Sequence, residues 1–168
     1  MDTLPLHPKI VHLPIALAVL MPLITAGLLI AWWRDMLPRR AWWIAVALQL
    51  VLVGSALYAR ETGEADEERV EARVGDAPLE AHEEAATVFL IGAVVALVAV
   101  GAAAVIRPEG LARGAAAAAV LAALVVLGLG YRVGQAGGAL VYQHGAAGVA
   151  ARAAPPGGGP ATVDQDDD

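Results

Sequence analysis

The sequence predicts an all-α integral membrane protein that folds as a four-helix transmembrane bundle. Hydrophobic residues make up 58% of the 168-residue chain. They are grouped in four long runs without a formal charge, and they do not follow the spacing of an amphipathic helix. A helix needs about 20 mainly apolar residues to cross the hydrocarbon core of a bilayer. We therefore expect a domain over residues 1–151 with spans at about 10–33, 41–59, 85–106 and 114–131.

The first run is better explained as a retained helix than as a cleaved signal peptide. It contains 24 residues, Ile10 to Trp33, with Pro14 and Pro22 inside it. A signal peptide has a shorter apolar core and ends at a site of small residues, whereas this run ends in two tryptophans followed by Arg34. The first span should therefore remain in the protein.

The later runs have the length and composition of packed membrane helices. The fourth is the shortest, but Arg113 and Arg132 flank it, and the long arginine stems can place their charges at the two interfaces. The third and fourth runs are rich in alanine and glycine, which allow close helix packing in lipid. Four tryptophans surround the first loop and predict an aromatic belt at the interface: Trp32, Trp33, Trp42 and Trp43.

The short loops predict the orientation, because positively charged loops stay on the cytoplasmic side. Residues 34–40 carry three arginines against one aspartate, and residues 107–113 carry two arginines against one glutamate. We therefore predict an N-out, C-out protein of the bacterial inner membrane, with the lipid bilayer as its surroundings. The segments then predicted outside, 1–9, 60–84 and 132–168, contain most of the acidic residues. Together with the net charge of −6, this disfavours nucleic-acid binding.

Three further features concern the predicted outer segments. Residues Glu64 to Val74 have the composition of a short solvated helix lying on the surface. Gly137 and Gly138 permit a break after the fourth span, so that the following apolar turn folds back on the bundle. Residues 152–168 are rich in proline and glycine and then acidic, which predicts a disordered tail.

The histidines carry the main functional signal. All four are predicted at the same end of the bundle, within a few residues of helix ends: His7, His12, His82 and His144. His12 lies within an apolar run, where an imidazole needs a partner. The chain has no cysteine, so thiolate metal sites and thioether-linked haem are excluded. The pattern predicts a metal or non-covalent haem site at one membrane face.

Two motifs resemble the bacterial membrane proteins called domain of unknown function 2231. They are His7-Pro8-x-x-Val11-His12-x-Pro14 at the start and Gly137-Gly138-x-Leu140-Val141-Tyr142-x-His144-Gly145 near the end. A histidine at the start of the third helix lies between them. The resemblance implies a four-helix membrane domain that some relatives join to Rieske iron-sulfur or cytochrome c modules. It thus implies a redox setting and redox partner proteins of these kinds.

The residues and the resemblance leave three functions open. The first is electron transfer by haem b held by two imidazoles, with Arg60 and Arg132 pairing with the propionates and Tyr142 as a further contact. The second is a compact copper, zinc or iron site of three or four imidazoles, with Glu61 or Glu83 nearby. The third is a structural accessory subunit. We place haem b slightly ahead. No catalytic residues are predicted, and whether the protein is an enzyme stays open.

Overall fold

The computed structural model describes residues 10–74 and 76–142, with the backbone alone over 64–74 and at residue 76. These residues form four long helices and a short 3-10 turn: α2 (His12–Trp33), η1 (Arg39–Ala41), α3 (Trp42–Val74), α4 (Asp76–Val105) and α5 (Glu109–Tyr142). Each long helix contains a segment of the length and hydropathy needed to cross a membrane. The described part of the chain contains no strand. The predicted all-α, four-helix membrane fold is confirmed.

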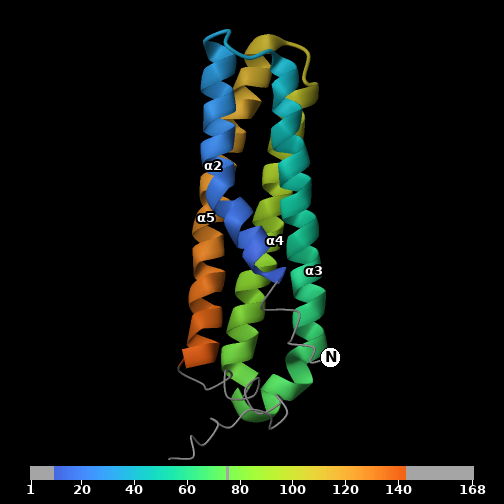
Figure 1. Ribbon diagram of the computed structural model, residues 1–168, viewed down its shortest axis with the longest axis vertical. Helices are drawn as coiled ribbons and strands as arrows, with labels where there is room; N and C mark the ends of the chain where they lie inside the picture. The colour runs from blue at the N-terminus through green and yellow to red at the C-terminus, as the bar shows by residue number, and fades with distance from the viewer. Residues whose placement is uncertain (1–9, 75, 143–168) are drawn as a thin grey trace, which may run out of the picture.

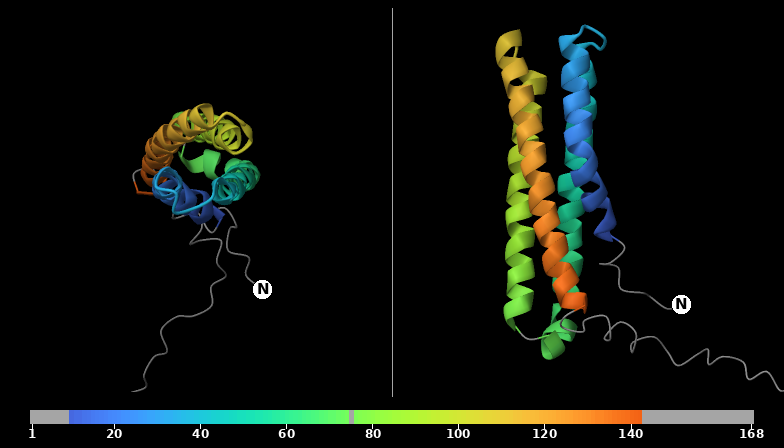
Figure 2. Two further views of the ribbon diagram at one scale, coloured as in Figure 1. Left: turned by 90° about the horizontal axis from the view of Figure 1, so that it is seen from above. Right: turned by 90° about the vertical axis from the view of Figure 1, so that its left-hand side faces the viewer.

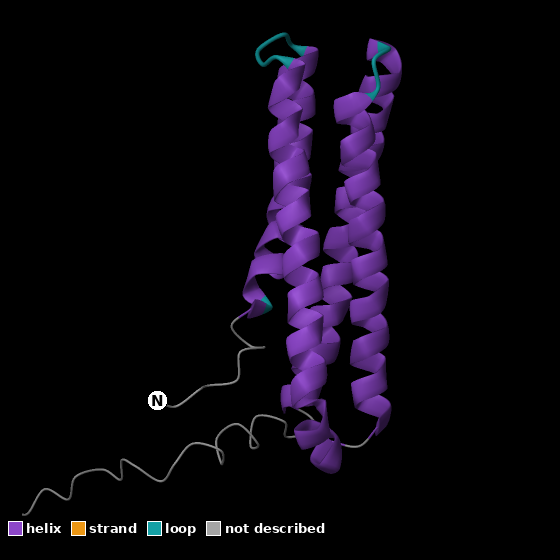
Figure 3. Ribbon diagram, turned by 90° about the vertical axis from the view of Figure 1, so that its right-hand side faces the viewer, coloured by secondary structure: helices purple, strands orange, loops and turns teal. Residues whose placement is uncertain are grey.

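The helices run alternately up and down and pack as a ring. In chain order, each helix packs against the next, and α5 closes the ring against α2. Figure 2 shows this ring end-on. The connections α2–α3 and α4–α5 lie together at one end, which we call the loop end (Figure 3). The opposite end, where α3 joins α4 and α5 ends, is called the terminal end (Figure 1).

Helix α2 is the shortest of the four and does not reach the terminal end. It has 22 residues, whereas the other three have 30 to 34. Its first half is inclined relative to its second half (Figure 1). Pro22 lies inside the helix and removes one backbone donor, which is the usual cause of such a bend. At the terminal end, the described bundle therefore consists of α3, α4 and α5.

Two predictions for the helix ends are wrong. Residues Glu64–Val74 do not form a separate surface helix, because α3 continues through them without a break. Their glutamates, alanines and arginines favour helix, so the second span extends beyond its apolar part. The predicted break at Gly137 and Gly138 is also absent, since α5 continues to Tyr142. Packing against α4 keeps these glycines helical despite their low propensity. The predicted tail lies outside the described residues.

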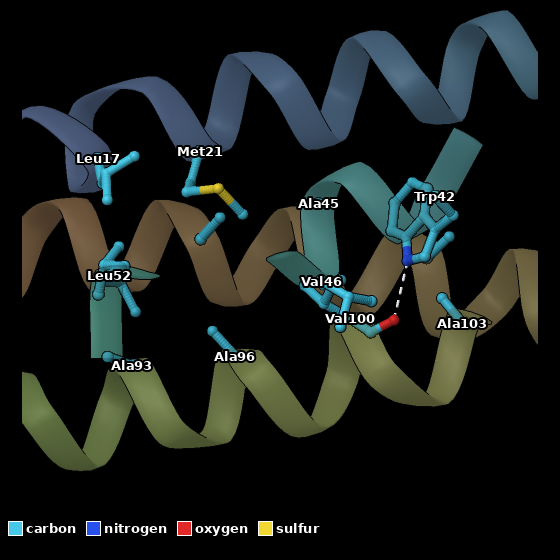
Figure 4. Close-up of a cluster of buried hydrophobic side chains, with 14 of the residues drawn as sticks. Leu17, Met21, Trp42, Ala45, Val46, Leu52, Ala93, Ala96, Val100 and Ala103 are labelled. Carbon is cyan, nitrogen blue, oxygen red and sulfur yellow. Dashed lines mark hydrogen bonds between the residues drawn. The ribbon is translucent and has the colours of Figure 1, made fainter. Parts of the chain in front are cut away.

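The core consists largely of alanine, which brings the helix backbones close together. Seven alanines are fully buried: Ala45, Ala93, Ala96, Ala103, Ala112, Ala116 and Ala119. Figure 4 shows several of them facing larger side chains such as Met21 and Leu52. Without a hydrophobic driving force between helices in lipid, this close packing and interhelical hydrogen bonds supply the stability.

Two hydrogen bonds fix the register of α3 against α4. The indole Nε1 of Trp42 donates to the carbonyl oxygen of Val100 over 2.9 Å (Figure 4). The amide Nε2 of Gln49 donates to the carbonyl oxygen of Ala93, also over 2.9 Å. The two donors are as far apart along α3 as the two acceptors are along α4. The two helices are therefore antiparallel, and each residue of one can be matched in level with a residue of the other.

Candidate functional site

His82 is the predicted site residue with the most defined surroundings. It lies on α4, is half-buried, and faces Gly137 of α5. A methyl group added at Gly137 would lie 3.3 Å from Cε1 of the His82 imidazole and 3.6 Å from its Nδ1. Most real methyl contacts are longer than 3.3 Å. The absence of a side chain at residue 137 thus makes room for the imidazole between α4 and α5.

Helix register places His12 at the level of His82. Ala18 of α2 and Phe89 of α4 both lie against Gly130 of α5. His12 and His82 precede these contacts by six and seven residues, or about 9 to 10 Å along each helix at 1.5 Å per residue. The two histidines therefore lie at a similar height toward the terminal end, with His12 nearer to the middle of the bundle because the first half of α2 is inclined, on helices that occupy opposite positions in the ring.

Arg60 belongs to the same level. It follows Gln49 by eleven residues on α3, and His82 precedes Ala93 by eleven residues on α4. Because the helices are antiparallel, both residues lie about 16 Å from the Gln49–Ala93 hydrogen bond toward the terminal end. This level of the bundle thus holds two histidines, one arginine and the space beside Gly137.

The remaining described candidates are more exposed. Arg132 lies on α5 and, with Glu84 of α4, lines a small groove on the outer side of the α4–α5 pair. Tyr142 is 89% exposed at the last residue of α5. His12 is exposed at the first residue of α2, and Glu61 and Glu83 are also exposed.

His7 and His144 lie outside the described residues, so the predicted set of four cannot be assembled from the structure. Among the described side chains, no group of three or more histidines, aspartates or glutamates could hold a metal ion. The structure brings His12 and His82 to one level without placing them in a common coordination sphere.

Sequence reasoning missed the importance of Gln49. Its side chain is 1% exposed within the apolar part of α3, where it hydrogen-bonds to α4. The available signal was an amide inside an apolar run, because a buried polar group in a membrane needs a partner. Gly137 was missed for a different reason: a glycine that accommodates a neighbouring ring looks, in sequence, like a helix break.

A second polar cluster at the loop end was also missed. The guanidinium of Arg39 donates from Nη2 to the carbonyl oxygens of Ala103, Ala104 and Ile106 at the end of α4. Both Arg39 and Arg113 lie over the ring of Trp32, at 5.8 and 5.6 Å from its centroid. Trp32 and Trp42 are buried, so the predicted aromatic belt describes only Trp33 and Trp43, which are about half exposed.

The fold and these clusters define a multi-pass membrane protein with an apolar middle and polar side chains concentrated at its two ends. A family model described as "Predicted membrane protein (DUF2231)" matches residues 3–150, and the chain belongs to this family. No curated protein and no solved structure matches the chain. The recognition from the two histidine-containing motifs therefore agrees with the family match.

Proposed function

We propose that this protein is a redox component of the bacterial cytoplasmic membrane that binds haem b near its terminal end. The observation that carries the proposal is the placement of the His82 imidazole in the space over Gly137, at the level of His12 and Arg60. Burying a histidine between two membrane helices costs free energy, so such histidines usually serve a function. Bound haem iron with two imidazole ligands would supply one-electron transfer between its ferric and ferrous forms.

The residues around His82 suit a ligand that is partly apolar and partly anionic. Gly134 has no atom within 4 Å of an added methyl group, so α5 presents little bulk about one turn before Gly137. Arg60 and Arg132 are exposed and carry guanidinium groups, which pair with carboxylates such as propionates. Tyr142 lies one to two helical turns beyond Gly137 and is available for a further contact.

The second imidazole ligand is proposed to come from His12, His7 or His144. His7 precedes Ile10 by three residues, and His144 follows Tyr142 by two.

Charge supports an outward-facing position for this site. The loop end carries five arginines against Asp35 and Glu109, and positive loops are retained in the cytoplasm. The terminal end is then extracytoplasmic, N-out and C-out, where soluble or membrane-bound redox partners of the Rieske or cytochrome c type are accessible.

Absorption spectroscopy of the detergent-purified protein tests the proposal directly. We expect a Soret band that sharpens and shifts on reduction with dithionite, and about one iron per chain by elemental analysis. If the Soret band is absent and the protein holds about one copper, zinc or iron per chain, the site binds a bare metal ion instead of haem. Neither signal, after expression with added haem precursor and metals, would overturn the redox proposal in favour of a structural subunit.

A matched pair of glycine substitutions tests the role of the His82 contact. Gly137→Ala should crowd the imidazole and weaken haem binding about tenfold, in the range seen when residues that contact metal ligands are changed. Gly138→Ala adds the same methyl group with no atom within 4 Å and should bind haem normally. Both variants gain the same helix propensity. Haem titration measures the difference, and equal affinities would contradict the proposed position of the ligand.

A further inference from the structure

The loop end presents a basic surface formed by Arg34, Arg40 and Arg107. All three side chains are exposed. Two of the five arginines at this end are engaged elsewhere: Arg39 with the α4 carbonyls and Arg113 with Glu109, at 2.6 Å. No carboxylate of the described residues forms an ion pair with the three exposed arginines. Their charge is therefore available to an anion from outside the chain.

The Arg39 hydrogen bonds bring two parts of this surface together. Arg39 binds the carbonyl oxygen of Ile106, so the residues that follow each of them, Arg40 and Arg107, flank the same contact. They come from different loops, which lie at one end of the bundle in Figure 3. The fold, rather than the local sequence, thus brings the backbone positions of Arg40 and Arg107 to the same end of the bundle.

Exposed apolar side chains show where this surface stands relative to a bilayer. Met36 and Leu37 lie between Arg34 and the η1 turn and are 70% and 42% exposed. Trp33, in the last turn of α2, and Trp43, in the first turn of α3, are about half exposed. Tryptophan favours the headgroup level, and apolar loop residues favour the acyl boundary. Arginines beside such residues suit the depth of lipid phosphates.

We propose that Arg40 and Arg107, with Arg34, bind the headgroup of an anionic phospholipid such as phosphatidylglycerol at the loop end. The guanidiniums contact the phosphate, and the neighbouring apolar side chains contact the first part of the acyl chains. Arginine pairs well with phosphate because its fork of donors matches the phosphate oxygens. The site is independent of haem and lies at the opposite end of the bundle.

Native mass spectrometry of the protein in neutral detergent provides the test, with phosphatidylglycerol and phosphatidylcholine as probes. We expect the protein to retain phosphatidylglycerol preferentially. Each basic residue near an anionic surface contributes about 1 kcal/mol, so the double variant Arg40→Gln, Arg107→Gln should bind it roughly 30-fold more weakly. Equal retention of both lipids by the unmodified protein would overturn the proposal.

A second double variant separates a specific site from general charge. Arg60→Gln, Arg132→Gln removes the same charge from exposed positions at the terminal end and should keep the full preference for phosphatidylglycerol. An equal loss in both double variants would mean non-specific attraction and would refute the site. Inorganic phosphate should not compete at millimolar concentration, and full competition would assign the surface to a free anion instead of a lipid.

Discussion

Replacing His82 with alanine should give a protein that inserts and folds as four helices but binds no haem. The imidazole is the proposed iron ligand, and alanine offers no donor atom in its place. The substitution removes a half-buried side chain outside the main core, so the structural cost should stay near 1 kcal/mol. Circular dichroism measures the helical content, and the Soret absorbance per chain measures the haem. Full haem occupancy in this variant would refute the assignment of His82.

The other histidines identify the second ligand. His12→Ala and His144→Ala should each abolish or strongly reduce haem binding if they ligate the iron, with membrane insertion unchanged. If His12→Ala retains haem while His82→Ala loses it, the second ligand is His144 or His7. Retention of full cofactor in both His12→Ala and His144→Ala would exclude both residues as iron ligands.

The sequence was sufficient for the number of helices and their class because apolar run length is a local property. Each predicted span lies largely within a helix of the structure, since a chain in lipid must satisfy its backbone hydrogen bonds internally. The ends were less predictable. Apolarity stops at the membrane surface, whereas helical structure continues wherever propensity and packing allow, as it does beyond Arg60 in α3.

The pairing of residues between helices could not be predicted, because it depends on register. Sequence shows that Gln49 is polar and Ala93 is small, but not that one hydrogen-bonds to the other. The same limit applies to the contact between His82 and Gly137, in which a residue without a side chain determines the available space. The sequence did predict that His12 and His82 lie at the same end of the bundle, because both are near the starts of helices on the same side of the membrane.

Arg39 should be the surface residue whose loss destabilises the bundle most. Arg39→Ala removes the donors to the last carbonyls of α4, which have no helical partner, and the contact with Trp32. Hydrogen bonds from charged donors and a cation–π contact together suggest a loss of about 2 to 4 kcal/mol in the free energy of unfolding. Unfolding of the protein by dodecyl sulfate in mixed micelles, followed by circular dichroism, measures this change.

The neighbouring arginine provides the matched control. Arg40 carries the same charge one residue later but is exposed, so Arg40→Ala should change the unfolding free energy by no more than about 0.5 kcal/mol in neutral detergent. Arg39→Lys keeps the charge near the negative end of the α4 dipole but lacks the planar fork that reaches several carbonyls, and it should recover about half of the loss. If Arg39→Ala and Arg40→Ala were equally stable, the cluster around Trp32 would not hold the loop end together. A graded series from arginine through lysine to alanine would instead assign the stability to the hydrogen bonds that tie η1 to the end of α4.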